Sequence, residues 1–329
     1  AASAQYAHIV GWGMGVPQRV MTNDDLARIV DTSDEWITSR TGIRQRHIAG
    51  EGETLTSISA EAARIAMKRA GVTASELDMI ILGTASPDRL LPSTAVEVQA
   101  ALGASRAAAF DVSAACSGWL YGIQVAEGML ATGSYETILV IGGEMLSRIV
   151  NWKDRNTCVL FGAGAGATIL TKATKGRGIL SAYMRSDGTL ADLLQRPKGG
   201  ANEPVTPEII AEGSHLMTMA GREVFKHAVR SMADAADRAL DGAKLSATDI
   251  DVMIPHQANI RIIEATAKHA SIPMEKVFVN VDRFGNTSAA SIPIALSEAH
   301  AQGIVKEGTT VMFVAFGAGF TWGSMVVRY

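Results

Sequence analysis

Short apolar runs alternate with longer amphipathic segments along most of the chain. Residues 80–82, 137–141 and 167–170 are almost wholly apolar, whereas residues 57–70 and 93–102 carry apolar side chains at helical spacing. Strands that are apolar on both faces are expected where helices cover both sides of a sheet. The pattern therefore predicts an α/β protein whose sheets lie between layers of helices.

The same pattern returns after about 173 residues. Residues 73–81 resemble residues 246–254: in both, a helix ends, an Asp precedes an apolar strand, and a loop follows. Two further blocks match in the same order. Residues 110–130 and 279–299 each predict a strand, a small-residue turn and a helix, and residues 137–143 and 310–316 each predict a strand. The alternative is that α/β segments resemble one another at this level of detail.

We interpret the repeat as an internal duplication. Two similar halves, residues 1–174 and 175–329, are expected to pack face to face, because no low-complexity linker separates them. The first half carries a longer insertion, at about residues 144–160, before a glycine-rich strand at residues 162–167.

Composition excludes several classes of protein. The chain has 329 residues, of which 47% are hydrophobic and 19% charged, so it has enough apolar side chains for a large core. A net charge of −3 weighs against a broad nucleic-acid surface, and no apolar run reaches the roughly 18 residues of a membrane span. Two cysteines cannot form a disulfide scaffold, and residues 1–5 lack the features of a secretory signal. We expect a cytoplasmic protein with neither a membrane nor a nucleic-acid partner.

Cys116 is the first candidate for chemistry. A buried strand is expected at residues 106–112 and a helix at residues 118–130, so the thiol would lie at the helix N-terminus. The partial positive charge there favours the thiolate. Lowering the usual pKa of about 8.5 by about two units would ionise most of the thiol at neutral pH. The local sequence leaves a second interpretation open, a small buried hydrophobe.

Two further polar residues lie at expected strand ends. His256 follows a strand at residues 251–254, and Asn286 is expected between another strand and a helix. A glycine-rich turn, residues 316–320, follows a strand at residues 311–315 and permits close approach of backbone N–H groups to a ligand. Ligands of α/β sheets bind at strand C-terminal ends, so we expect these turns to meet around Cys116. A core histidine and a turn or helix-cap asparagine are the structural alternatives.

The other cysteine and the other histidines show no pattern that indicates a catalytic or metal site. Cys158 is expected to lie in the core of a strand. No pair of histidines has metal-ligand spacing with a cysteine or a carboxylate, so we expect no metal site.

Several longer motifs extend this picture. They are Thr22-Asn23-Asp24, residues 31–37, residues 40–43, the Cys116 turn, residues 255–259, residues 285–291 and residues 316–323. On these motifs the chain resembles the β-ketoacyl-acyl-carrier-protein synthase III family nearly end to end. The resemblance implies a thiolase-like fold, in which a duplicated α/β unit forms a five-layered αβαβα sandwich. It also implies a homodimer, formed in part by the insertion of the first half, and an enzyme without a cofactor.

The resemblance implies a decarboxylative Claisen condensation that initiates fatty acid synthesis. An acyl group from acyl-coenzyme A (acyl-CoA) would be held on Cys116 and joined to malonyl-acyl carrier protein. The products would be β-ketoacyl-acyl carrier protein, CO₂ and coenzyme A, formed by a ping-pong mechanism. His256 and Asn286 would hydrogen-bond the malonyl thioester carbonyl, and the N–H groups of Cys116 and Ala318 would form the oxyanion hole. Decarboxylation leaves an enolate, which needs hydrogen-bond donors and no metal or redox cofactor.

The resemblance also implies binding residues. Trp36 and Arg155 would enclose the adenine of coenzyme A, and Arg40 and Asn259 would line the pantetheine route. The carrier protein would dock on Arg261, with Lys226 and Lys268. The expected acyl-pocket residues are Leu91, Leu146, Phe161 and Met217.

Three positions depart from the family pattern. Ala163 stands where Asp is common, and Ala318 stands where Gly is frequent. Leu91 stands where Phe is often found, in a loop that in the family reaches the partner subunit's pocket. The smaller side chain predicts a wider pocket that accepts branched or medium-chain primers beside acetyl.

Other functions share some of these features. The order Cys116, His256, Asn286 is also that of papain-like proteases, but the Cys-Gly-Ser-Cys-Trp context of that family is absent. A thiolase would need a second cysteine within residues 316–320, and there is none. An acyltransferase of secondary metabolism on the same scaffold would keep Cys116 and His256, so this alternative stays open.

Overall fold

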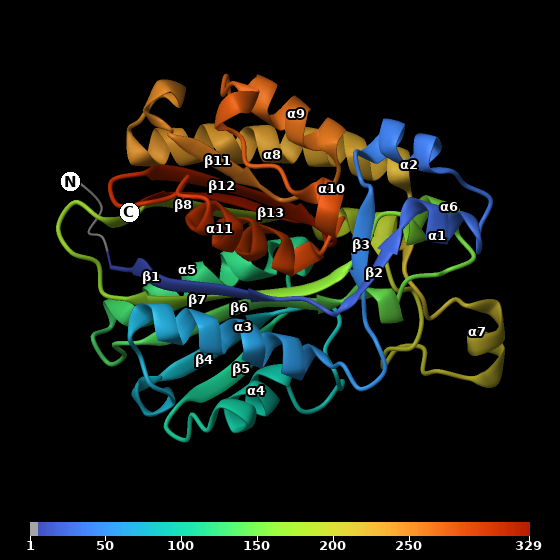
Figure 1. The fold of residues 1–329 in the computed structure, drawn as a ribbon, viewed down its shortest axis with the longest axis horizontal. Helices are drawn as coiled ribbons and strands as arrows, with labels where there is room; N and C mark the ends of the chain where they lie inside the picture. Colours follow the sequence, from blue (N-terminus) through green and yellow to red (C-terminus); the bar gives the residue numbers. More distant parts are fainter. Residues whose placement is uncertain (1–5) are drawn as a thin grey trace.

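Within residues 6–329, two large sheets alternate with three layers of helices (Figure 1). The computed structural model describes residues 6–329, so residues 1–5, where no secretory signal is expected, lie outside the described part. The expected five-layered αβαβα sandwich is confirmed.

The first sheet belongs to the N-terminal half. Its strands, in spatial order, are β1 (His8–Gly15), β7 (Ala163–Thr171), β6 (Ile138–Met145), β4 (Met79–Gly83) and β5 (Ala108–Val112). Strand β4 is parallel to both β5 and β6, whereas β7 is antiparallel to β1 and β6. The outer face is covered by α3 (Leu55–Ala70) and α4 (Thr94–Leu102).

The second sheet belongs to the C-terminal half. Its order is β11 (Val252–Pro255), β12 (Thr310–Gly317), β13 (Thr321–Arg328) and β8 (Gly178–Ser186). Its outer face carries α8 (Gly221–Ala243), against which α9 (Ile260–His269) packs. Between the sheets lie α5 (Gly118–Ala131) and α11 (Ser291–Ala301), each contacting both sheets.

Smaller elements surround the end of the sandwich that faces the viewer's right in Figure 1. They are β2 (Arg19–Thr22), β3 (Gln45–Ile48), α1 (Asn23–Ala27), α2 (Asp34–Thr41), α6 (Arg155–Cys158), α7 (Pro207–Glu212), β9 (Leu194–Gln195), β10 (Thr218–Met219) and α10 (Val281–Phe284). Two short 3-10 turns also matter for the site: η2 (Ala115–Ser117), which leads into α5, and η7 (Ser288–Ala290), which leads into α11.

The duplication appears in backbone conformation. Ala115 (φ 47°) and Ser288 (φ 50°) open η2 and η7, lie 173 positions apart, and are both left-handed. The residues that end α3 and α8, Gly71 and Lys244, are also left-handed and have the same separation. Non-glycine residues seldom adopt this conformation, so the coincidence supports two copies of one structural unit. The proposed division at residues 174 and 175 falls in the connection between β7 and β8.

The expected strand before Asn286 is not formed. Residues 281–284 are the short helix α10, and one bridge, between Met253 and Val277, is all that extends the second sheet at that edge. The Gln257 side chain explains the difference. Its Oε1 accepts hydrogen bonds from the N–H groups of Asn280 (2.9 Å) and Val281 (3.2 Å), which a strand would offer to the sheet.

Three other expectations need correction. The strand expected at residues 106–112 begins at Ala108 and, as β5 at the sheet edge, is only partly buried in the single chain. Cys158 is fully buried as expected, but it belongs to α6, because Asp154 caps a helix there. Strand β12 continues to Gly317, so the glycine-rich turn is a tight hairpin into β13.

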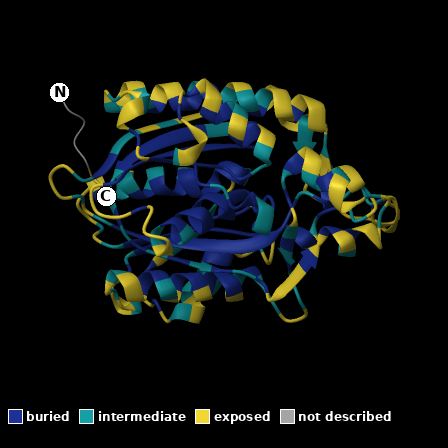
Figure 2. Cartoon of the chain, turned by 45° about the horizontal axis from the view of Figure 1, so that its top comes forward, coloured by how far each residue is buried: buried dark blue, intermediate teal, exposed yellow. Residues whose placement is uncertain are grey.

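Burial follows the layers. The central strands of both sheets and most of the helices between them are buried, while exposed residues gather on the outer helices and the peripheral segments (Figure 2). Leu90 and Leu91 are exceptions among apolar residues, since they are 85% and 87% exposed. Within residues 6–329, no helix has both the length and the apolar character needed to cross a membrane.

Candidate active site

The Cys116 side chain is held at the start of the inner helix α5. Left-handed Ala115 precedes it, and the whole Cys116 residue is 8% exposed. The end of β12 passes so close that a Cβ on Gly317 would lie 2.5 Å from the Cys116 nitrogen. Only glycine allows this approach, which brings the β12–β13 hairpin and its Ala318 against the thiol.

The structure contradicts the expected low pKa of this thiol. The pKa of Cys116 is raised to about 12, chiefly by burial; the Ser288 hydroxyl lowers it in part, and the nearby Glu144 carboxylate adds to the rise. The loss of hydration in the closed site outweighs the helix N-terminus. The resting thiol is protonated, so its use as a nucleophile requires a group that takes up the proton.

His256 lies directly after β11, as expected, and is 2% exposed. Its backbone N–H donates to the Val314 carbonyl (2.7 Å), and its Nδ1 lies 2.6 Å from the Ser291 hydroxyl. Burial lowers the pKa of His256 to about 3, so the imidazole is neutral. A neutral ring can donate one hydrogen bond without bringing a charge into the pocket.

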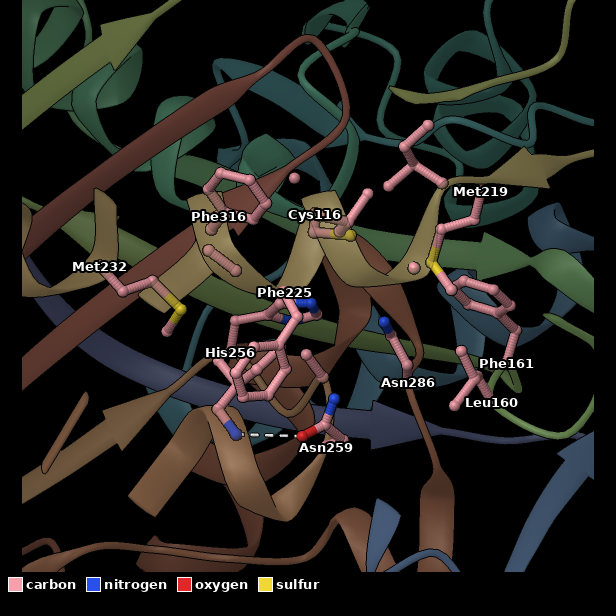
Figure 3. Close-up of a pocket in the computed structure, with 17 residues that line it drawn as sticks. Cys116, Leu160, Phe161, Met219, Phe225, Met232, His256, Asn259, Asn286 and Phe316 are labelled. Atoms are coloured by element: carbon pink, nitrogen blue, oxygen red, sulfur yellow. Dashed lines mark hydrogen bonds between the residues drawn. The ribbon is translucent and has the colours of Figure 1, made fainter. Parts of the chain in front are cut away.

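Asn286 is fixed by its backbone. Its N–H donates to the Leu160 carbonyl (2.8 Å), and its carbonyl accepts from the Gly162 N–H (3.0 Å). The side-chain Oδ1 accepts from the Ser288 N–H (2.8 Å), which leaves the amide nitrogen directed toward the space between Cys116 and His256 (Figure 3).

The three polar turns meet as expected. Cys116, His256 and Asn286 line one small cavity of about 90 Å³, whose other walls are mostly apolar. They come from the start of α5, the end of β11 and the turn before α11, and only the packing of the two halves brings them together (Figure 3).

A second, larger cavity is also lined by Cys116. It measures about 440 Å³, and its walls include Cys116, Ala318 and three of the four expected acyl-pocket residues, Leu146, Phe161 and Met217. Leu91 lines neither cavity of its own chain and points away from the molecule.

A third cavity, of about 650 Å³, leads inward from the surface. It shares Leu160, Met219 and Gly221 with the small cavity, so the two are adjacent. Its walls carry four side chains that suit a large anionic ligand: Trp36, Arg40, Arg261 and Arg222. Arg222 was not identified from the sequence, where it is one basic residue among many on an amphipathic helix.

The residues expected to bind coenzyme A differ in how well their positions suit this role. The guanidinium groups of Arg40 and Arg155 lie 4.5 and 4.9 Å from the centre of the Trp36 ring. These are direct cation–π contacts, which leave no room for a purine between Trp36 and Arg155 as they stand. Asn259 lines the small cavity, but its side chain caps α9 by accepting from the Ile262 N–H (Figure 3).

The expected carrier-protein residues lie on neighbouring outer helices. Arg261 begins α9 at the entrance, Lys226 is exposed on α8, and Lys268 lies near the far end of α9. Arg261 also donates to the Ser39 carbonyl (2.9 Å), which ties α9 to α2.

The structure adds three polar residues that sequence reasoning missed. Ser291 holds the His256 ring, Ser288 lines the larger cavity beside the thiol, and Glu144 is fully buried. A carboxylate inside the apolar strand at residues 138–145 was the one available signal. Among residues 6–329, no three His, Cys, Asp or Glu side chains gather as metal ligands would.

Comparison with solved structures places this architecture in a known class. The 3-oxoacyl-acyl-carrier-protein synthase III of Aquifex aeolicus covers 98% of this chain and 100% of its own, with 47% identity and a TM-score of 0.91. The priming β-ketosynthase of the R1128 polyketide pathway covers 100% and 98%, with 30% identity and a TM-score of 0.90. Fold and site together define a condensing acyltransferase with a thiolase-like fold.

Sequence comparison narrows the class to a family. The family model described as 3-oxoacyl-[acyl-carrier-protein (ACP)] synthase III matches residues 110–188, and the model of its C-terminal part matches residues 240–329. The β-ketoacyl-[acyl-carrier-protein] synthase III of Roseiflexus castenholzii is 52% identical over 326 residues, which is 99% of each chain. The chain belongs to the 3-oxoacyl-acyl-carrier-protein synthase III family, whose members carry out the initiating condensation of fatty acid synthesis.

Proposed function

We propose that this chain condenses an acyl group from acyl-CoA with malonyl-acyl carrier protein by a ping-pong mechanism. The observation that carries the proposal is that one residue, Cys116, lines two different cavities. Cys116 faces an apolar cavity suited to an acyl chain and a cavity with two neutral polar groups, His256 and Asn286.

In the first half-reaction, Cys116 sulfur bonds the acyl carbon and the coenzyme A thiolate leaves. The Cys116 N–H group belongs to η2, and the Ala318 N–H group belongs to the β12–β13 hairpin. These two segments are in close contact at Gly317, so both N–H groups would stabilise the oxyanion. Leu146, Phe161 and Met217 would then enclose the acyl chain.

In the second half-reaction, His256 and Asn286 would donate to the malonyl thioester oxygen as CO₂ departs. The tautomer that we propose for His256 uses the Ser291 hydroxyl as a donor. Its oxygen accepts from the Gln257 N–H (3.3 Å), and its hydrogen would be donated to His256 Nδ1 (2.6 Å). The ring proton then resides on Nε2, which would donate to the malonyl thioester oxygen. Loss of CO₂ leaves an enolate, whose carbon attacks the acyl group on Cys116.

The entrance supports the expected ligands. Arg40, Arg222 and Arg261 surround it, which suits the phosphates of coenzyme A and an acidic carrier protein. Adenine would have to displace Arg155 from the Trp36 ring in order to stack there.

We also propose a homodimer. Strand β5 leaves one edge of the first sheet unpaired, and edge strands of this kind readily pair with another chain. The exposed Leu91 would then enter the partner's acyl cavity. Sedimentation at micromolar concentration tests this, and a monomer would contradict it.

The decisive experiment uses intact-protein mass spectrometry after incubation with a panel of acyl-CoA thioesters. One acyl mass per chain is expected, and none for Cys116→Ala; acylation of that variant would exclude Cys116 as the nucleophile. His256→Ala and Asn286→Ala should each lower condensation by about 10²–10³ while acylation of Cys116 is better retained. If either variant lost acylation of Cys116 but kept malonyl decarboxylation, that residue would belong to the first half-reaction instead of the second.

A second function is supported by the likeness to the priming β-ketosynthase of a polyketide pathway. Such an enzyme would use the same residues, so carrier preference distinguishes the two. Condensation with a fatty-acid carrier protein but not with polyketide carriers supports our proposal. The papain-like alternative has no support in the fold or the family.

A further inference from the structure

Glu144 is a carboxylate buried behind the nucleophile, and the mechanism above gives it no role. It is the penultimate residue of β6, is 0% exposed, and has no cationic partner within residues 6–329. Its Oε atoms accept hydrogen bonds from the Ala85 N–H (3.0 Å), the Thr84 hydroxyl (3.2 Å) and the Ser86 hydroxyl. An unpaired buried carboxylate is costly, so its presence calls for an explanation.

Ser288 lies between this carboxylate and the thiol. Its turn, η7, packs directly on β6 and on the start of α5, because a Cβ on Gly142 would lie 2.0 Å from the Ala289 oxygen and one on Gly118 would lie 3.3 Å from the Ala289 Cβ. The left-handed backbone of Ser288 holds its side chain in this gap, where Ser288 lines the larger cavity together with Cys116. Its hydroxyl lowers the pKa of both the Cys116 thiol and the Glu144 carboxyl group.

We propose that Glu144, acting through the Ser288 hydroxyl, receives the Cys116 proton when the thiol attacks the acyl thioester. The inference rests on the proposed function of Cys116. As the S–C bond forms, the S–H bond breaks, the proton passes to Ser288 Oγ, and the Ser288 proton passes to Glu144. The coenzyme A thiolate then leaves and takes up the proton, which restores the Glu144 carboxylate and gives neutral coenzyme A thiol.

Charge conservation in the pocket favours this route. Transfer to Glu144 moves one negative charge from oxygen to sulfur, so the closed site never holds a second buried charge. Transfer to His256 would instead create an ion pair with a buried imidazolium, and burial opposes that charge, lowering the pKa of His256 to about 3. Burial raises the pKa of Glu144 to about 7, so this carboxyl group accepts a proton readily.

The ionisable groups near Glu144 are few. Cys116 faces it from η2, and His256 lies across the small cavity at the end of β11. The nearest carboxylates on neighbouring segments are otherwise engaged: Asp88 bonds the first N–H groups of α3, and Asp111 bonds those of α4. The titration of Glu144 should therefore be visible in the reactivity of Cys116.

The test compares Glu144→Gln and Ser288→Ala with wild type. Alanine is compatible with the left-handed turn, since Ala115 occupies the equivalent position in the other half. Glu127→Gln is the matched control, a half-buried glutamate on α5 away from the cavities. Each protein is assayed for Cys116 alkylation by iodoacetamide across pH, for acylation by acetyl-CoA, and for decarboxylation of malonyl-CoA.

In the wild type, alkylation should rise through an apparent pKa near 7, because the Glu144 carboxylate must be ionised to accept the proton. Both variants should lose this step and acylate about 10²-fold more slowly, while decarboxylation stays near the wild-type rate. A variant with the wild-type alkylation profile, or with all three rates lowered together, would overturn the proposal. A wild-type enzyme that is alkylated but never acylated would instead contradict the proposed function.

Discussion

Gly317→Ala should slow acylation of Cys116 although it leaves the Cys116 side chain itself unchanged. The added methyl would lie 2.5 Å from the Cys116 nitrogen and 2.8 Å from its Cβ. Both distances are shorter than real side-chain contacts, so β12 or η2 must move apart. The Cys116 and Ala318 N–H groups belong to these two segments, so they would no longer converge on one oxygen atom.

The magnitude follows from the two effects. Losing one oxyanion donor costs about 10²–10³ in rate, and misplacing a reacting group by about 1 Å costs about 10². We therefore expect acylation of Cys116 to fall by at least about 10². Overpacking of a buried site should also lower the free energy of unfolding by about 1–3 kcal/mol.

The assay is the time course of acylation measured by intact-protein mass spectrometry, with thermal unfolding measured in parallel. Gly128→Ala is the control, since this glycine on α5 has open space where the methyl would lie. It should acylate normally. If Gly317→Ala acylates at the wild-type rate, the inferred oxyanion hole is wrong. If it no longer folds, the close approach is structural and Ala318→Gly becomes the test of the hairpin.

Three further outcomes are expected. Arg261→Glu should weaken the use of malonyl-acyl carrier protein, more so at low salt, with acylation by small acyl-CoA little changed; equal losses in both would indicate misfolding. Leu91→Phe should shift primer preference toward acetyl by roughly tenfold, and a wild-type enzyme that accepts acetyl alone would show that the pocket is closed by other side chains. Burial lowers the pKa of His300, which stacks on Trp12, to about 3, so its contribution to stability is present above pH 6.5 and is lost as pH falls toward 3. Unfolding midpoints from pH 7 to pH 4 should therefore decline less in His300→Gln, and equal slopes would exclude the effect.

Much of the architecture could be predicted from local pattern. Helices α3 and α4 begin within two residues of the expected positions, because apolar spacing and capping residues such as Thr54 are short-range signals. The strand expected before Asn286 failed because a distant side chain, Gln257, captures its backbone donors. Sequence alone cannot show such a competitor, since it lies more than 20 positions away.

The sequence by itself determined the duplication, the two buried sheets and the residue types of the site, Cys116, His256 and Asn286. All of these depend on local periodicity or on motifs read along the chain. The tertiary structure decided the protonation of the thiol and the partners around it. Burial and the approach of Glu144 and Ser288 set the pKa of Cys116, and they depend on how the two halves pack. The helix N-terminus is a local feature, whereas loss of water is a property of the closed site, and here the second effect outweighs the first.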